Sequence, residues 1–314
     1  MSVDPVVLFF LLGVAARLVR SDLRLPEAMY EGLSIYLLLA IGLKGGVELA
    51  RHPLAALVPQ AVAVVMLGLA LPLLAFPVLK YLGRLDHFNA ASIAAHYGSV
   101  SVVTFAVALA YLADQRIAHE PYMPLFAVLL EVPGIVVGIL IARLGAHVRG
   151  VAWGALAHEV LSGRSILLLT GGLLIGWMAG PDALAPQADL FFSLFKGVLA
   201  LFMLEMGIVA AARIRELRRT GPFLVAFGTL MPIGFALIGA LVGRSIGLSV
   251  GGTMLLATLA ASASYIAAPA AMRVAVPQAN PSLSLAASLG VTFPFNVVVG
   301  VGLYTWIAQR IHAL

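Results

Sequence analysis

The chain has 314 residues, of which 62% are hydrophobic and 11% are charged, and its formal net charge is +5. Roughly a quarter of the residues of a soluble domain are charged, so this composition excludes a water-soluble fold and indicates a protein that folds in lipid. The absence of cysteine excludes disulfides and thiolate chemistry. The basic residues lie singly or in pairs at the ends of apolar runs, which indicates membrane topology rather than nucleic-acid binding.

Apolar runs bounded by charged residues, Gly and Pro predict an all-α membrane protein of about ten transmembrane helices. We expect the first run to be a retained span rather than a signal peptide, because it has no basic n-region and no small-residue cleavage site. In chain order, the predicted spans cover residues 5–19, 27–43, 54–80, 88–112, 122–146, 164–180, 189–210, 221–247, 250–275 and 282–309.

The distribution of Lys and Arg predicts how these spans are oriented. The cytoplasmic side of a membrane protein carries the excess of basic residues, and here that side is the one with the odd-numbered connections, so both termini are predicted to be non-cytoplasmic in a cell inner membrane. The basic residues counted on that side are Arg17, Arg20, Arg24, Lys80, Arg84, Arg143, Arg149, Arg164, Arg213, Arg215, Arg218, Arg219 and Arg273.

Similar short patterns recur in the two halves and predict a 5+5 inverted repeat. Two repeats with an odd number of spans are inverted with respect to each other, as in many transporters. The third span closes on Gly83-Arg84 and the eighth on Gly243-Arg244, and the fourth and ninth each carry a Ser-x-Ser. We predict a first repeat over residues 1–146, a cytoplasmic connection over 147–163 and a second repeat over 164–314.

The fourth and ninth spans are predicted to be interrupted at the middle of the bilayer. Gly98 permits a break beside Ser99, Ser101 and Thr104, and the ninth span carries Ser262 and Ser264. Half-helix N-termini suit an anion, whereas freed carbonyls and Ser hydroxyls suit sodium. The alternative is that these small residues allow close helix packing, with hydroxyls bonded to their own helix.

Several polar side chains inside spans need a partner or a function, because an ionisable group costs about 2.5–3.5 kcal/mol on insertion scales. Glu131 is expected to bind a cation or proton, or to cap the backbone freed by Pro133. Glu205 is expected to pair with Lys196 or a neighbouring Arg. His96 is expected to contact an anion or to be a satisfied structural group, and Tyr265 to gate the site or to fill space.

Motifs of other protein classes are absent from the sequence. It contains no Walker P-loop, no His-Glu-x-x-His helix and no Gly-x-Ser-x-Gly elbow. We therefore expect neither an ATP-driven pump nor an enzyme, and no cofactor beyond a coupling ion.

Taken together, these segments resemble the SbtA family of sodium-dependent bicarbonate transporters over most of the chain. The resemblance implies a core domain and a gate domain, a homotrimer, and a site where the fourth and ninth spans cross. It places Gly98, Ser99, Val100, Ser101 and Thr104 at the anion, and Ser262, Ser264 and Tyr265 at sodium. The segments that carry it are Ile41–Gly46, Gly98–Ser101 with Thr104, Glu131–Pro133, Met206–Gly207, Arg213–Leu217, and Ser262–Arg273 continuing through Val276–Ser282.

Departures from this family pattern keep alternatives open. Relatives known to move bicarbonate have an acidic residue where this chain has Tyr265, so a proton-coupled or uncoupled carrier of another small carboxylate is the second hypothesis. The 147–163 connection is short, although the family pattern still allows a regulatory partner resembling the PII signalling proteins.

A third hypothesis is a membrane receptor or scaffold that binds a soluble partner through its basic connections. It predicts that replacing Arg215, Arg218 and Arg219 abolishes function while replacing Ser101 and Ser264 does not; transport predicts the reverse.

Overall fold

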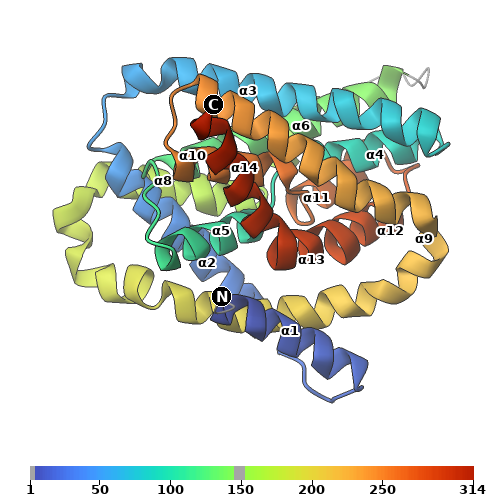
Figure 1. Ribbon diagram of the computed structural model, residues 1–314, viewed down its shortest axis with the longest axis horizontal. Coiled ribbons are helices and arrows are strands. Elements are labelled where there is room, and N and C mark those ends of the chain that lie inside the picture. The colour runs from blue at the N-terminus through green and yellow to red at the C-terminus, as the bar shows by residue number, and fades with distance from the viewer. Residues whose placement is uncertain (1–3, 145–152) are drawn as a thin grey trace.

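A computed structural model describes residues 4–144 and 153–314, and these residues form helices and connections without any strand. Figure 1 shows most helices running along one direction, with the connections gathered at two ends. The α-helices are α1 (Pro5–Leu18), α2 (Glu27–Leu49), α3 (Leu54–Pro77), α4 (His87–Gly98), α5 (Val102–Asp114), α6 (Met123–Leu144), α7 (Trp153–Leu161), α8 (Arg164–Leu184), α9 (Phe195–Ser245), α10 (Val250–Ala261), α11 (Ala267–Ala275), α12 (Pro281–Leu285), α13 (Phe293–Phe295) and α14 (Val301–Ala313). Short 3-10 or π-helical turns join several of them: η1 (Val78–Leu82), η2 (Ala185–Gln187), η3 (Asp189–Ser193), η4 (Ala286–Thr292) and η5 (Asn296–Gly300).

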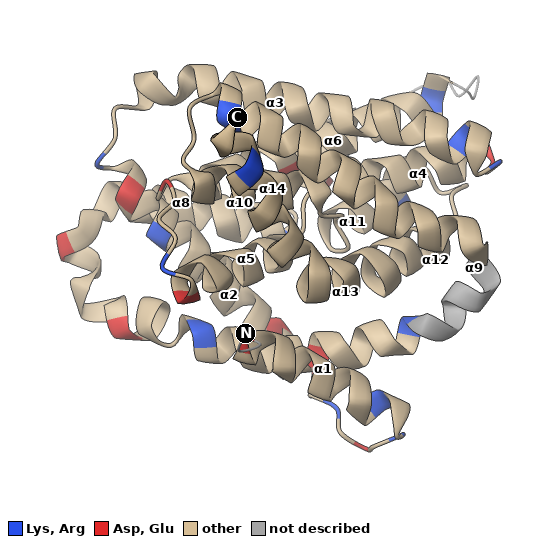
Figure 2. Ribbon diagram, in the orientation of Figure 1, with Lys and Arg blue, Asp and Glu red and all other residues tan. Residues whose placement is uncertain are grey.

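The lengths and compositions of these helices make the chain a multi-pass membrane protein. In the described part, eight stretches of helix are long and apolar enough to cross a membrane, and Pro5–Leu18 and Val250–Ala261 are shorter apolar helices. Figure 2 shows the charged residues mostly at the helix ends and connections, with few along the helix middles. Arg149, which contributes to the predicted orientation, lies outside the described residues.

Glycine at positive φ marks two sharp changes of direction. The predicted seventh and eighth spans form one helical stretch, α9, in which Gly221 has φ 83° and ψ 161°. Only glycine adopts this conformation without steric cost, and the following Pro222 starts the returning segment at its first turn. The chain therefore reverses at the side of Figure 1 where α9 is labelled. Gly180 and Pro181 make a similar break near the end of α8.

Two pairs of helices pack unusually closely through glycine. A Cβ atom on Gly42 or Gly46 of α2 would lie 2.6 Å or 2.1 Å from a backbone oxygen of α8. In the same way, Cβ atoms on Gly13 of α1 and Gly207 of α9 would lie 2.0 Å and 2.1 Å from a backbone oxygen of the other helix. Small residues allow such backbone approach in lipid, where packing rather than water drives helix association. Helix α2 thus packs against α8, and α1 against α9, with their backbones in direct contact at these glycines.

The fourth predicted span lies at the centre of the bundle. Within His87–Asp114, 94% of the residues of the apolar 18-residue window are buried, against 28% for the corresponding window of Arg164–Gln187. A span surrounded by protein on every side can contain irregular backbone that lipid would not tolerate. The position of α4 and α5 thus allows a polar site there.

The connection before α8 is partly helical. Within the predicted 147–163 loop the structure has the short helix α7, Trp153–Leu161, while residues 145–152 lie outside the described part.

Candidate functional site at the crossing of two interrupted helices

Two membrane segments are interrupted where the sequence predicts. Helix α4 ends at Gly98 before α5 begins at Val102, and α10 ends at Ala261 before α11 begins at Ala267. Both α4 and α10 have 12 residues, and each is followed by a serine in extended conformation, Ser99 or Ser262. Each interruption exposes the carbonyls of one half-helix and the N–H groups of the next.

The two interruptions bind each other through buried hydrogen bonds. The N–H of Ser264 donates to the His96 carbonyl at 2.8 Å, and the N–H of Ser101 donates to Ser262 Oγ at 2.8 Å. The Ser262 hydroxyl in turn donates to the Leu259 carbonyl at 2.8 Å. Ser262, predicted as a sodium ligand, therefore braces the crossing and keeps one lone pair on its oxygen.

Two helix N-termini, those of α5 and α11, start at this crossing. Ser101 caps α5, since its Oγ accepts from Thr104 N at 3.2 Å and from Thr104 Oγ1 at 3.0 Å. Ser264 Oγ accepts from Ala268 N at 3.1 Å. Because both serine oxygens accept these bonds, their hydroxyl hydrogens remain able to donate. Together with the helix dipoles and the free N–H groups of the first turns, they favour a negatively charged ligand.

A small cavity lies between these N-termini. Its volume is about 10 Å³, close to what one water molecule needs. The cavity thus has room for about one water molecule in this structure. The residues that line it are Val100, Ser101, Val102, Glu131, Ser165, Ser264, Tyr265 and Ile266.

Glu131 brings a carboxyl group from α6 into this cavity. Its side chain is 1% exposed, and Oε2 has no hydrogen-bond partner. No hydrogen bond of the described residues joins the Glu131 side chain to the backbone near Pro133, and Glu131 lines the cavity. An uncompensated carboxylate at this depth is costly, so the group requires a proton or a bound cation.

Three further polar groups beside the crossing are buried without a partner: His96 Nε2, Ser99 Oγ and Tyr265 OH. His96 Nδ1 lies 2.7 Å from the Ser92 carbonyl. A carbonyl only accepts, so Nδ1 carries the hydrogen, and in the neutral ring Nε2 is an acceptor. Buried polar groups are nearly always paired in folded proteins, so this concentration of unpaired groups indicates a site for a polar ligand.

A larger space lies next to the small cavity. A vestibule of about 400 Å³ shares Tyr265 and Ile266 with it, and also reaches Arg164 and Arg273, on the side predicted to be cytoplasmic. The other residues lining this inner vestibule are Tyr30, Ser34, Glu159, Pro269, Ala270, Val274 and Leu285.

A second vestibule, of about 380 Å³, lies between α2, α5 and the start of α9. Ile41 lines both this vestibule and a narrow apolar constriction, whose walls also include Val102 and Ile266. The small cavity thus shares Tyr265 and Ile266 with the inner vestibule, whereas the apolar space lined by Ile41 lies between it and the outer vestibule. The constriction is lined by Ser34, Leu37, Leu38, Ile41, Val102, Val103, Ala106, Phe202 and Ile266.

Some residues of the site were not predicted from the sequence. Asn296 Nδ2 donates to the Ala261 carbonyl at 3.0 Å, which satisfies the end of α10. A single amide within the apolar run Phe293–Gly300 was a signal for it. Ser165 also lines the cavity, and its position beside Arg164 at the end of a span gave no such signal.

Of the partners expected for Glu205, Lys196 or a neighbouring Arg, the first was wrong. Lys196 forms an ion pair with Asp114 of α5, and Glu205 Oε2 accepts a hydrogen bond from Leu25 N at 3.2 Å. Nine residues of α-helix separate Lys196 and Glu205 by about 13 Å, so the two groups lie at different depths of the same helix.

Paired interrupted helices, with a small polar cavity at their crossing and a vestibule on either side, are an arrangement found in membrane transporters. A family model, the Na⁺-dependent bicarbonate transporter superfamily, matches residues 5–309. The chain therefore belongs to this superfamily, and with it to the transport proteins rather than the enzymes. A search of curated proteins gives no match.

Proposed function

We propose that the protein is a secondary active symporter that moves bicarbonate together with sodium and binds both at the crossing of α4, α5, α10 and α11. The observation that carries this proposal is the small cavity that lies between two helix N-termini and is lined by Glu131, whose Oε2 has no hydrogen-bond partner. The membership of the superfamily supports the choice of these two ions.

The N-terminal side of the crossing suits the anion. The hydroxyls of Ser101 and Ser264 and the first N–H groups of α5 are donors, and a compact oxyanion accepts several of them at once. Thr104 fixes the orientation of Ser101 rather than binding the anion itself. Gly98, Ser99 and Val100 supply the backbone of the break, and the free Ser99 hydroxyl is a further donor.

Glu131 gives a physical reason for coupling. A carboxylate and a bicarbonate ion in the same dry cavity repel each other strongly, because the low dielectric hardly screens their charges. A cation bound at Glu131 removes this repulsion, so the anion binds well only together with the cation. The hydroxyls of Ser264 and Tyr265 and the remaining lone pair of Ser262 are oxygens near this position. Glu131 thus takes the role of the acidic residue expected at position 265.

The contacts between helices support a five-plus-five inverted repeat. Helix α1 packs on α9 in the way that α8 packs on α2, each through closely approaching glycines. Asp86 and Ser99 flank α4, and Ser249 and Ser262 flank α10. The number of residues from Asp86 to Ser249 equals the number from Ser99 to Ser262. The basic residues of the odd-numbered connections support non-cytoplasmic termini, with the inner vestibule open to the cytoplasm.

Uptake of labelled bicarbonate into proteoliposomes tests this proposal. A sodium gradient is expected to drive accumulation in the wild-type protein, and Glu131→Gln is expected to abolish the sodium dependence, because the amide carries no charge to be compensated. Glu159→Gln, which removes a carboxylate from the inner vestibule outside the cavity, is the control and should retain the dependence. Bicarbonate uptake that is indifferent to sodium in the wild type would overturn the coupling.

Proton coupling is a second candidate, favoured by Tyr265 and by the unpaired Oε2 of Glu131. In that case a pH gradient replaces the sodium gradient as the driving force in the same assay. Accumulation under an imposed pH gradient without sodium, lost in Glu131→Gln, would select this candidate.

A further inference from the structure

The outer vestibule contains a basic group whose charge is not compensated. Lys44 of α2 lines this cavity, and it takes part in no ion pair or hydrogen bond of the described residues. The other charged side chains on the wall have partners: Lys196 pairs with Asp114, and Glu48 pairs with Arg51 at 3.1 Å. Lys44 is therefore a charged group on this wall that has no ion-pair partner among the described residues.

His119 lies close enough to Lys44 to be affected by its positive charge. It lies in the connection between α5 and α6 and lines the same cavity. Burial lowers the pKa of His119, and the positive charge of Lys44 lowers it further, while the Ile117 backbone and the Glu120 charge act in the opposite direction. The positive charge that disfavours a second one here also attracts an anion to the same space.

The walls around Lys44 strengthen its field. Three aromatic side chains, Phe191, Phe192 and Phe195, line the cavity, and they carry no charge that could screen the ammonium group. Charges beside low-dielectric walls focus the field into the cleft and raise the local concentration of counter-ions. At about 380 Å³ the cavity also has ample room for a small anion with several of its water molecules.

The position of Lys44 connects the vestibule to the crossing. Ile41, one turn earlier on the same face of α2, lines both the vestibule and the apolar constriction that leads to Val102. An anion bound at Lys44 would therefore lie next to the apolar constriction, on the side away from Ser101 and Ser264.

We propose that Lys44, with His119 beside it, forms a recruiting subsite for small monovalent oxyanions in the outer vestibule, separate from the site at the crossing. The identity of the anion as bicarbonate rests on the proposed function, whereas the subsite itself rests on the charges and walls described above. Binding at this subsite raises the local concentration of the anion beside the constriction before the constriction opens.

Thiol chemistry tests the subsite without any transport. The chain has no cysteine, so Ala113→Cys places a single thiol on the vestibule wall of the full-length protein. The rate of its reaction with an anionic sulfonate methanethiosulfonate is divided by the rate with a cationic trimethylammonium methanethiosulfonate. This ratio cancels any change in the thiolate fraction, because both reagents react with the same thiolate.

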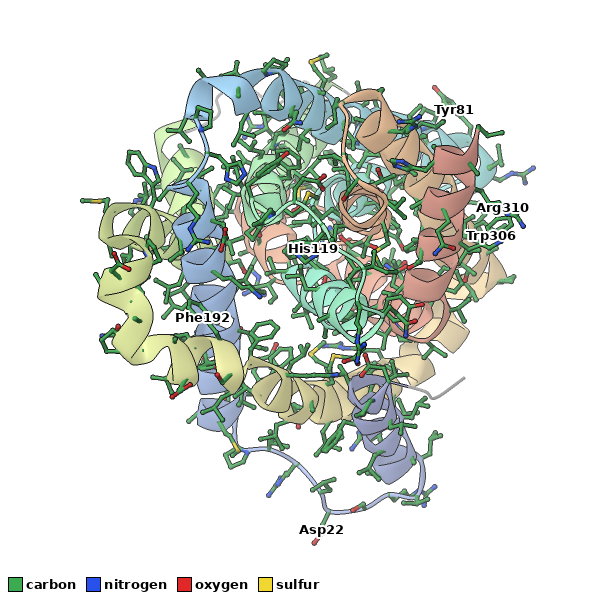
Figure 3. All side chains as sticks on the ribbon, turned by 60° about the vertical axis from the view of Figure 1, so that its left-hand side comes forward. Asp22, Tyr81, His119, Phe192, Trp306 and Arg310 are labelled. Atoms are coloured by element: carbon green, nitrogen blue, oxygen red, sulfur yellow. The ribbon has the colours of Figure 1, made fainter. Side chains whose placement is uncertain are left out.

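Lys44→Met in the Ala113→Cys background is expected to lower this ratio roughly tenfold, the lower end of electrostatic rate effects in charged clefts. Lys44→Arg keeps the positive charge and should preserve the ratio, which would show that substitution at position 44 does not by itself disrupt the vestibule. Arg310→Gln is the matched control: it removes one charge at the same end of the molecule, and Figure 3 shows Arg310 beside Trp306, well away from His119. Sodium bicarbonate, compared with sodium gluconate at equal ionic strength, should slow the anionic reagent only when Lys44 is present.

An unchanged ratio after Lys44→Met, or the absence of bicarbonate protection, would overturn the subsite. In proteoliposomes, Lys44→Met should raise KM for bicarbonate and leave the maximal rate unchanged; a loss of maximal rate with unchanged KM would also contradict recruitment. If the wild-type protein transports no bicarbonate, the proposed function fails, while the thiol ratio still decides whether the vestibule attracts anions.

Discussion

The two interrupted segments differ in length and in access, although they start from similar half-helices. The first interruption, residues 99–101, is fully buried and is closed by the Ser101 cap. The second, residues 262–266, is longer, and its last two residues reach the inner vestibule. The first interruption therefore supplies a fixed wall of the site, and the second supplies the part that faces an opening. A transporter that exposes its site to one side at a time needs such an asymmetry.

The two interruptions are also held in place by different physical means. Gly98, at the end of α4, touches the backbone of α6 at Gly134, where an added Cβ would lie 2.0 Å from the Gly98 oxygen. The end of α10 is held instead by the hydrogen bond from Asn296 to Ala261. A steric contact tolerates no extra atom, whereas a hydrogen bond is lost when its donor is removed. Substitutions at the two ends should therefore fail in different ways.

The largest effect is expected from Gly134→Ala, which forces a methyl group into the backbone of α4. Overpacking costs about 1–3 kcal/mol in general, and a backbone neighbour that cannot rotate away places this case at or above the upper end. Thermal unfolding of the purified protein measures the loss. Gly171→Ala in α8 is the control, because its Cβ meets nothing within 4 Å; equal stability of the two variants would show that the first interruption is not held sterically.

Asn296→Ala should destabilise the second interruption by about 1–3 kcal/mol, because it leaves the buried Ala261 carbonyl without a donor. The same substitution removes the acceptor of the Tyr304 hydroxyl, at 2.6 Å. Tyr304→Phe separates the two contributions, since it removes only the second bond. Chemical unfolding of both variants gives the difference, and an Asn296→Ala variant no less stable than Tyr304→Phe would contradict the brace.

The capping serines test which interruption binds the anion more strongly. Ser101→Ala should cost about 1 kcal/mol of stability, the usual loss for an N-cap. Ser264→Ala should cost less, because Ser264 Oγ accepts one hydrogen bond, from a backbone N–H, whereas Ser101 Oγ accepts two, from the backbone N–H and the hydroxyl of Thr104. Each loses a hydroxyl donor, so each should also raise KM for bicarbonate up to about tenfold. Ser245→Ala, exposed at the end of α9, should change neither quantity. An unchanged KM in both variants would remove the anion from this side of the crossing.

The smallest effect concerns Asp86, at the end of α4 that lies away from the crossing. Burial raises the pKa of Asp86, but hydrogen bonds from Asn89 and from nearby backbone N–H groups outweigh it and hold the pKa below its usual value. A carboxyl group with a lowered folded-state pKa stabilises the fold above the unfolded pKa and loses this contribution as the pH falls through the folded value. We expect Asp86→Asn to cost a few tenths of a kcal/mol at pH 7, with the difference from wild type disappearing in acid. A difference that persists in acid, measured by thermal unfolding against pH, would show that the cap acts through something other than its charge.

The sequence by itself determined that the chain is a helical multi-pass membrane protein and where two of its apolar segments break. Length and hydropathy decide a span, because every backbone group in lipid must be satisfied within its own helix. Gly98 and the Ser-x-Ser patterns located the breaks, because local backbone freedom and local hydroxyls are properties of consecutive residues. The glycine-rich run of α2 was likewise visible, and its tight packing follows from the missing side chains.

Only the tertiary structure decided which groups meet. The entry of Glu131 into the cavity of Ser101 and Ser264, the brace from Asn296, and the position of Lys44 beside His119 all join residues far apart in the chain. Helix rotation and depth set these contacts, and both depend on packing between helices rather than on the residues of any one helix. The mistaken partner of Glu205 has the same origin, because closeness along a sequence does not fix depth in a bundle.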